Sequence, residues 1–209
     1  MLIKGLYAIT PDIANTDLLL KTVEAALQGG ASVLQYRNKL ANQQLQTQQA
    51  RALLPLCRQY NVPLIINDLV KLCLTFDADG VHLGTDDGNL TEVRARNGQN
   101  KILGASCYNR FDLALQAQAQ GASYVAFGAC FTSTTKPNAP KASLDLFAQA
   151  KTELIIPTVA IGGITLQNAP QLIKAGASAV AVINAIFSPS FTTDDIKLAS
   201  QQFSLMFTH

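Results

Sequence analysis

Segments typical of strands and of helices alternate along the whole chain, and this alternation limits the fold more than any other feature. The strand-like segments are short and apolar, at residues 4–10, 32–37, 64–67, 80–83, 102–107, 124–131, 158–161 and 179–183. The helix-like segments that follow them lie at residues 17–28, 42–60, 70–76, 90–95, 111–120, 144–151, 166–175 and 193–206. Apolar strands that alternate with helices are typical of a parallel sheet covered by helices. Pro55 predicts a kink in the second helix or its division into two shorter helices.

A short motif recurs where a predicted helix ends and the next strand begins. It occurs as Gly30-Ala31-Ser32-Val33, Ala78-Asp79-Gly80-Val81, Gly121-Ala122-Ser123-Tyr124-Val125 and Gly176-Ala177-Ser178-Ala179-Val180. Repeated junctions are expected from a barrel of similar units. An open doubly wound sheet is disfavoured because no G-x-G-x-x-G follows the first strand. We therefore predict a compact (β/α)8 TIM barrel, a single domain over residues 1–209.

The composition excludes several classes of function. Apolar residues make up 48% and charged residues 14%, which allows a large core and excludes a disordered chain. A net charge of +2 without a long basic run gives no indication of a nucleic-acid partner. No apolar stretch reaches the length of a membrane span, and the N-terminus does not have the order of a signal peptide. The four cysteines form no CxxC pair, so we expect free thiols and a cytoplasmic protein without a membrane partner.

Polar residues gather where the predicted strands end. In a (β/α)8 barrel these carboxyl ends carry the functional residues. The candidates, in strand order, are Gln35, Arg37 and Lys39; Asn67 and Asp68; Asp87; Ser106; Ser133-Thr134-Thr135-Lys136; Gly162-Gly163; and Ile183-Asn184. Their expected position at one edge of the barrel predicts a single site.

The charged candidates favour an anionic ligand and a metal ion. Arg37 and Lys39 suit a diphosphate, which arginine binds bidentately, although two solvated loop cations are the alternative. Asp68 and Asp87 suit Mg²⁺, a hard cation that prefers oxygen ligands. Helix N-capping is the alternative for Asp68. His82 is interpreted as a structural residue that makes a local hydrogen bond.

The later candidates suit a phosphate. Residues 133–136 combine hydroxyl groups with an ammonium group. Gly162 and Gly163 allow backbone N–H groups to approach an anion, and a phosphate site after strands seven and eight is frequent in such barrels. Close packing of strand against helix is the alternative role for these glycines.

Seven stretches, taken in order, resemble the thiamine-phosphate synthase family over nearly the whole chain. They are Leu6-Tyr7-Ala8-Ile9-Thr10, Gln35-Tyr36-Arg37-Asn38-Lys39, Leu64-Ile65-Ile66-Asn67-Asp68, Ala78-Asp79-Gly80-Val81-His82-Leu83-Gly84 with Asp87, Gly104-Ala105-Ser106, Ser133-Thr134-Thr135-Lys136 and Ala160-Ile161-Gly162-Gly163-Ile164. The resemblance implies a Mg²⁺-dependent TIM-barrel transferase. Such an enzyme joins hydroxymethylpyrimidine diphosphate to thiazole phosphate and releases diphosphate and thiamine phosphate.

The resemblance also implies a role for each matching residue. Arg37, Lys39, Asn67 and Lys136 would hold the diphosphate, Asp68 and Asp87 would hold Mg²⁺, and Gln35 would contact the pyrimidine. Ser133, Thr135, Gly163 and the backbone of Ile183 and Asn184 would hold the thiazole phosphate. Ser106, which would contact the leaving diphosphate, and Lys136 are the expected catalytic residues. The expected partners are these two small substrates, and the oligomeric state stays open, a homo-oligomer included.

The chain departs from the family pattern close to the predicted site. Leu69, Lys71, Thr85, Tyr108 and Asn184 replace the family's usual Arg, Asp, Gln, His and Ser. Two alternatives therefore stay open. One is a thiazole tautomerase, which would need a base such as histidine where this chain has Tyr108 and Ala129. The other is a barrel that binds a phosphorylated ligand without turnover.

Overall fold

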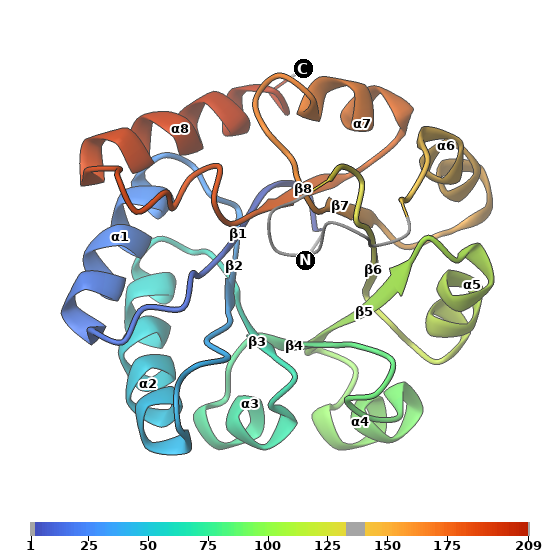
Figure 1. The fold of residues 1–209 in the computed structure, drawn as a ribbon. Coiled ribbons are helices and arrows are strands. Elements are labelled where there is room, and N and C mark those ends of the chain that lie inside the picture. The colour runs from blue at the N-terminus through green and yellow to red at the C-terminus, as the bar shows by residue number, and fades with distance from the viewer. Residues whose placement is uncertain (1–2, 133–140, 209) are drawn as a thin grey trace.

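The structure, a computed structural model, describes residues 3–132 and 141–208. Within these residues, eight parallel strands form a closed barrel in chain order, and helices surround it (Figure 1). The strands are β1 (Gly5–Ile9), β2 (Val33–Tyr36), β3 (Leu64–Asn67), β4 (Gly80–Leu83), β5 (Ile102–Tyr108), β6 (Tyr124–Phe127), β7 (Thr158–Ile161) and β8 (Ala179–Val182). The helices are α1 (Thr16–Gln28), α2 (Gln43–Gln59), α3 (Val70–Phe76), α4 (Leu90–Asn97), α5 (Phe111–Ala119), α6 (Leu144–Glu153), α7 (Ala169–Ala175) and α8 (Thr193–Leu205). The predicted (β/α)8 barrel is confirmed.

Some predicted boundaries are wrong, each for a local reason. The sixth strand ends at Phe127 instead of residue 131: its regular pairing with β7 stops there, and the Cys130 and Phe131 N–H groups then donate to the Ile161 and Gly162 carbonyls from outside the strand. Helix α7 begins at Ala169 instead of residue 166, because the preceding residues form a turn in which Asn168 Oδ1 accepts a hydrogen bond from the Thr165 N–H over 2.8 Å. The remaining elements lie close to their expected positions.

Helix α2 runs without a break through Pro55, so its division into two shorter helices is wrong. Proline leaves one carbonyl of the preceding turn without its N–H partner, here that of Arg51. Pro55 lies on the exposed face of the helix, where water can reach that carbonyl.

The apolar core has two parts, separated by the sheet. One cluster fills the barrel and includes Val33, Ile65 and Val159. A larger cluster lies between the strands and the helices and includes Leu34 and Leu103. Because side chains alternate across a strand, the same alternation directs selected polar residues into the barrel.

Cys57, Cys73, Cys107 and Cys130 are all free and buried, as predicted. In the part of the chain that the structure describes, none of the helices combines the length and apolarity needed to cross a membrane.

Candidate active site

Two carboxylates from neighbouring strands meet at the carboxyl edge of the barrel. Asp68 follows β3, and Asp87 lies in the loop after β4. Burial and then the neighbouring Asp87 carboxylate raise the pKa of the Asp68 carboxyl group. Asn67 Nδ2 donates to Asp68 Oδ2 over 2.6 Å, and Lys39 Nζ lies 3.8 Å from that oxygen. Two carboxylates this close repel each other unless a cation lies between them, so the pair fits a divalent metal ion.

The backbone around both carboxylates is held by hydrogen bonds. Asp68 has a left-handed conformation, with φ 60°, and its N–H donates to the His82 carbonyl over 2.8 Å. Asp87 Oδ2 accepts from the Gly84 N–H over 2.9 Å. The N-cap of α3 is Leu69, without a side-chain cap. The alternative in which Asp68 caps this helix is therefore wrong.

The described protein side chains alone would not complete the coordination shell of a metal ion at this site. Among residues 3–132 and 141–208, no group of three or more His, Cys, Asp or Glu side chains could hold a metal ion. Mg²⁺ usually takes one or two carboxylates and completes its shell with water and substrate phosphates. A carboxylate pair beside phosphate-binding cations agrees with that donor set.

Arg37 and Lys39 follow β2 and are fixed by residues after β1. Thr10 Oγ1 accepts from the Arg37 N–H over 2.9 Å and donates to the Arg37 carbonyl over 2.8 Å. Asp12 accepts from the Lys39 N–H over 2.7 Å and from Arg37 Nη1 over 3.5 Å. Asp12 is not among the site residues predicted from the sequence. The polar run Thr10-Pro11-Asp12 was the available signal.

A buried amide anchors the turn between these two cations. Gln49 on α2 is fully buried, and its Oε1 accepts from Tyr36 Oη over 2.8 Å and from Asn38 Nδ2 over 3.0 Å. Its Nε2 donates to the Ile13 carbonyl over 2.8 Å. Sequence reasoning could not distinguish Gln49 from the other glutamines of this helix, because only the fold shows which one is buried.

Ser106 on β5 is connected through His82 to the backbone of Asp68, one of the two paired carboxylate residues. Its Oγ lies 2.9 Å from His82 Nε2, while the His82 carbonyl accepts from the Asp68 N–H. Burial lowers the pKa of His82 to about 4, so the imidazole is neutral near pH 7. The prediction that His82 is hydrogen-bonded is confirmed, but the bonds are not local: they connect His82 to Tyr124 on β6 and to Ser106, a predicted site residue on β5.

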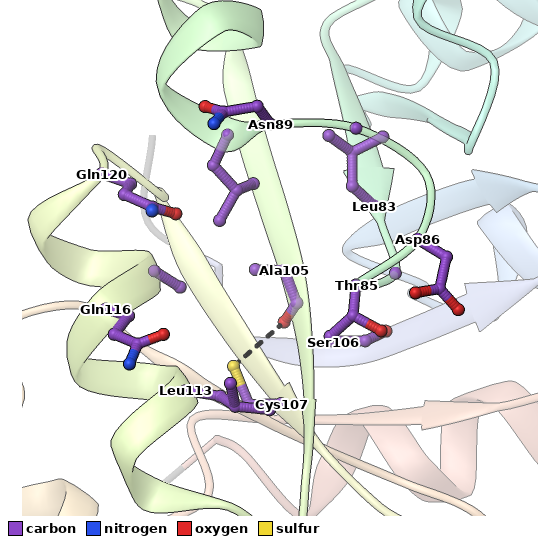
Figure 2. Close-up of a pocket in the computed structure, with 14 residues that line it drawn as sticks. Leu83, Thr85, Asp86, Asn89, Ala105, Ser106, Cys107, Leu113, Gln116 and Gln120 are labelled. Atoms are coloured by element: carbon purple, nitrogen blue, oxygen red, sulfur yellow. Dashed lines mark hydrogen bonds between the residues drawn. The ribbon is translucent and has the colours of Figure 1, made fainter.

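Two cavities lie beside these residues. The larger, of about 430 Å³, lies between the ends of β4 and β5 and the helices α4 and α5, with Ser106 and Thr85 on its wall (Figure 2). The smaller, of about 70 Å³, is lined by residues that include Lys39, Asn67 and Asp68. Thr85 Oγ1 also lies 3.3 Å from Tyr108 Oη, so two of the departures from the family pattern contact each other.

The ends of β7 and β8 offer backbone instead of charged side chains. Gly162 and Gly163 have positive φ angles of 99° and 64°. A Cβ on Gly163 would lie 2.7 Å from the Thr132 carbonyl oxygen, and one on Gly162 would lie 2.7 Å from Ala129 Cα. These glycines allow the loops after β6 and β7 to pack together. The alternative role was close packing of strand against helix, and the structure shows close packing against a loop instead.

The remaining candidates on this side are Ile183, Asn184 and residues 133–136. Ile183 accepts hydrogen bonds from the Ile186 and Phe187 N–H groups and begins a turn that exposes Asn184. Ser133, Thr134, Thr135 and Lys136 lie outside the described residues. Their expected contacts with the thiazole phosphate and the diphosphate stay predictions.

The closed barrel and the polar group at the carboxyl ends of its strands define the class: a (β/α)8-barrel enzyme. The family model described as thiamine monophosphate synthase matches residues 6–186. The thiamine-phosphate synthase of Methylobacillus flagellatus is 56% identical over 205 residues, covering 98% of this chain and 96% of that protein. The corresponding enzyme of Nitrosospira multiformis is 49% identical, covering 98% and 86%.

A solved structure agrees with these relatives. The thiamine phosphate pyrophosphorylase of Pyrococcus furiosus superposes with a TM-score of 0.84 at 31% identity, covering 97% of this chain and 95% of that chain. This chain belongs to the thiamine monophosphate synthase family.

Proposed function

We propose that this protein is a Mg²⁺-dependent thiamine-phosphate synthase. It joins hydroxymethylpyrimidine diphosphate to thiazole phosphate and releases diphosphate. The observation that carries the proposal is the close pair of Asp68 and Asp87, with Lys39 and Asn67 beside it, at the carboxyl edge of a barrel. The full-length similarity to thiamine-phosphate synthases supports the same substrates.

The reaction needs a stabilised leaving group more than an enzyme nucleophile. The C–O bond between the exocyclic carbon of the pyrimidine and the diphosphate breaks, and its electron pair leaves with the diphosphate oxygen. The electron-rich ring stabilises the positive charge on that carbon. The lone pair of the thiazole nitrogen then forms the new C–N bond, so neither a triad nor a strong base is required.

The residues after β2 and β3 would neutralise the leaving group. Arg37, Lys39 and Asn67 donate hydrogen bonds to the diphosphate, and Lys136 adds a further charge. Asp68 and Asp87 hold Mg²⁺, which supplies positive charge to the diphosphate oxygens when it is bound. Ser106 donates a hydrogen bond from its hydroxyl group to an oxygen of the departing group. Ser106 and Lys136 are therefore the proposed catalytic residues.

The remaining residues would bind and orient the two rings. Gln35, which is buried on β2, contacts the pyrimidine. Gly163 and the Ile183–Asn184 backbone hold the phosphate of the thiazole, together with Ser133 and Thr135. Glycine at position 163 tolerates the positive φ and leaves the backbone at the site free of a side chain.

The test is mass-spectrometric detection of thiamine phosphate from the two purified substrates. We expect equal amounts of thiamine phosphate and diphosphate, loss of both after EDTA treatment, and recovery on addition of Mg²⁺. Full turnover after exhaustive EDTA treatment would contradict the metal assignment. Isomerisation of a thiazole without coupling would instead indicate the tautomerase, and binding of both substrates without product would indicate the non-catalytic barrel.

A further inference from the structure

A continuous chain of hydrogen bonds crosses the interior of the barrel, and most of its members have no role in the mechanism above. Gln35 Nε2 on β2 donates to Tyr7 Oη on β1 over 2.9 Å. Tyr7 Oη lies 2.7 Å from Tyr124 Oη on β6. Tyr124 Oη lies 2.9 Å from His82 Nδ1 on β4, and His82 Nε2 lies 2.9 Å from Ser106 Oγ on β5. We call these five linked side chains the relay. The residues at its two ends, Gln35 and Ser106, are both proposed to contact substrate.

The relay is built into the barrel and not left on its surface. Tyr7 and Tyr124 are at most 1% exposed. The His82 ring stacks on Tyr124, with centroids 5.6 Å apart and planes at 24°. Gly104 makes room for this phenol, since a Cβ there would lie 2.2 Å from Tyr124 Cζ. Buried polar groups cost free energy even when paired, and apolar side chains fill the barrel elsewhere, so packing alone does not explain these residues.

The number of protons gives the relay one direction. Burial raises the pKa of both phenols, so each keeps one proton to donate. Tyr7 accepts from the Gln35 amide, and therefore its own proton goes to Tyr124. Tyr124 in turn donates to His82 Nδ1. A neutral imidazole that accepts at Nδ1 carries its proton on Nε2 and donates to Ser106 Oγ.

Ser106 is then left with one free proton. Its oxygen accepts from His82, so the hydroxyl proton points to another acceptor. The leaving diphosphate is an acceptor only, and its charge increases as the C–O bond breaks. A hydroxyl already oriented towards it loses little energy in reorientation during the reaction.

We propose that Tyr7, Tyr124 and His82 are positioning residues, which orient Ser106 as a donor to the departing diphosphate and tie this orientation to the Gln35 amide. The inference rests on the proposed function, because the contacts of Ser106 and Gln35 come from it. Gln35 and Ser106 serve opposite ends of one substrate, the pyrimidine and its diphosphate. The relay therefore holds the donors for both ends in one fixed arrangement.

The first test needs no turnover. The chain has two histidines, so nitrogen-15 NMR of the histidine-labelled protein resolves His82 against a single other residue. We expect His82 to carry its proton on Nε2 in the wild type, and to lose this fixed tautomer in Tyr124→Phe. A proton on Nδ1 in the wild type would overturn the relay direction, whether or not the protein makes thiamine phosphate.

The second test is kinetic. Tyr124→Phe should lower kcat by about 10- to 100-fold, the range found when a supporting hydrogen bond is removed. The KM for thiazole phosphate should change less than about twofold, because this substrate does not contact the relay. Tyr60→Phe is the matched control. It removes the same hydroxyl from a tyrosine that donates to Glu24 over 3.0 Å, and it should keep the wild-type kcat.

A double-mutant cycle separates positioning from general loosening of the barrel. If Tyr124 acts through Ser106, Tyr124→Phe should change kcat less than about twofold when Ser106 is already alanine. Equal losses on both backgrounds would overturn the proposal, as would an unchanged kcat in Tyr124→Phe. Absence of thiamine phosphate with the wild type would be a failure of the proposed function, and the tautomer of His82 would still decide the relay.

Discussion

The two halves of the barrel's carboxyl edge are built in different ways. After β2, β3 and β4, the site consists of charged side chains, each held by a neighbour: Lys39 and Asn67 beside Asp68, and Gly84 beside Asp87. After β7, it consists of backbone, with Gly162 and Gly163 packed against the preceding loop. We call the first the charged half and the second the backbone half. A side chain of the charged half can be removed while the backbone stays in place. A side chain added in the backbone half would displace the backbone.

The largest effect should come from Asp68→Asn, in the charged half. Asparagine tolerates the φ of 60°, so the backbone should stay in place. Loss of one metal ligand should lower kcat by about 10³-fold, by analogy with the loss of a group that stabilises transition-state charge. Steady-state kinetics at saturating Mg²⁺ measures this.

The stability of Asp68→Asn tests whether Asp68 supports the fold as well as the site. Because the change removes repulsion from the Asp87 carboxylate, the melting temperature in EDTA should not fall. A clear fall would mean that Asp68 supports the fold, and the charged half would then resemble the backbone half.

A second charge substitution, Lys136→Ala, should lower kcat by about 10²-fold and also raise KM for the pyrimidine diphosphate. The prediction rests on the sequence motif, since this residue lies outside the described segments. Lys141→Ala removes an exposed lysine outside the motif and serves as the control. Wild-type kinetics in Lys136→Ala would remove this lysine from the diphosphate site.

In the backbone half, Gly163→Ala should reduce stability and binding together. Its Cβ would meet two carbonyl oxygens, of Thr132 at 2.7 Å and Phe131 at 2.8 Å. We expect a loss of about 1–3 kcal/mol in the free energy of unfolding, and a higher KM for thiazole phosphate.

The matched control for this substitution is Gly98→Ala. Gly98 also has a positive φ, of 77°, but a Cβ there would meet nothing within 4 Å. Its backbone, with φ 77° and ψ 171°, is one that only glycine adopts readily, so Gly98→Ala should also lose stability, but its KM for thiazole phosphate should be unchanged. An equal change of KM for thiazole phosphate in the two variants would show that the close packing of Gly163 is unimportant for the site.

The same contrast explains how much the sequence could predict. The barrel follows from the alternation of elements, and the charged candidates follow from residue type at strand ends, as the pair Asp68 and Asp87 illustrates. Gln49, Tyr7 and Tyr124 could not be predicted as site supports. A buried amide or phenol acquires its role from partners on other strands, such as the bond between Tyr124 and His82, and local sequence does not contain those pairings.

The backbone half was only partly predictable for another reason. The sequence predicts that backbone approaches an anion at Gly162 and Gly163, but the packing of these glycines against residues 129–132 depends on the path of two loops. The conformational propensities of residues describe one segment at a time, and they contain no information on the distance between two loops.

The smallest effect should come from Tyr108→Phe, at a departure from the family pattern. The Tyr108 hydroxyl contacts Thr85 Oγ1 over 3.3 Å, and the side chain is exposed. A hydrogen bond open to water contributes less than the usual ~1 kcal/mol, so kcat/KM should change less than about threefold and stability by less than about 0.5 kcal/mol. Phenylalanine keeps the ring and the left-handed backbone, so only the hydroxyl is tested. If kcat/KM instead fell more than about tenfold, this hydroxyl would contact substrate, and the charged half would depend on neutral groups as well as on charge.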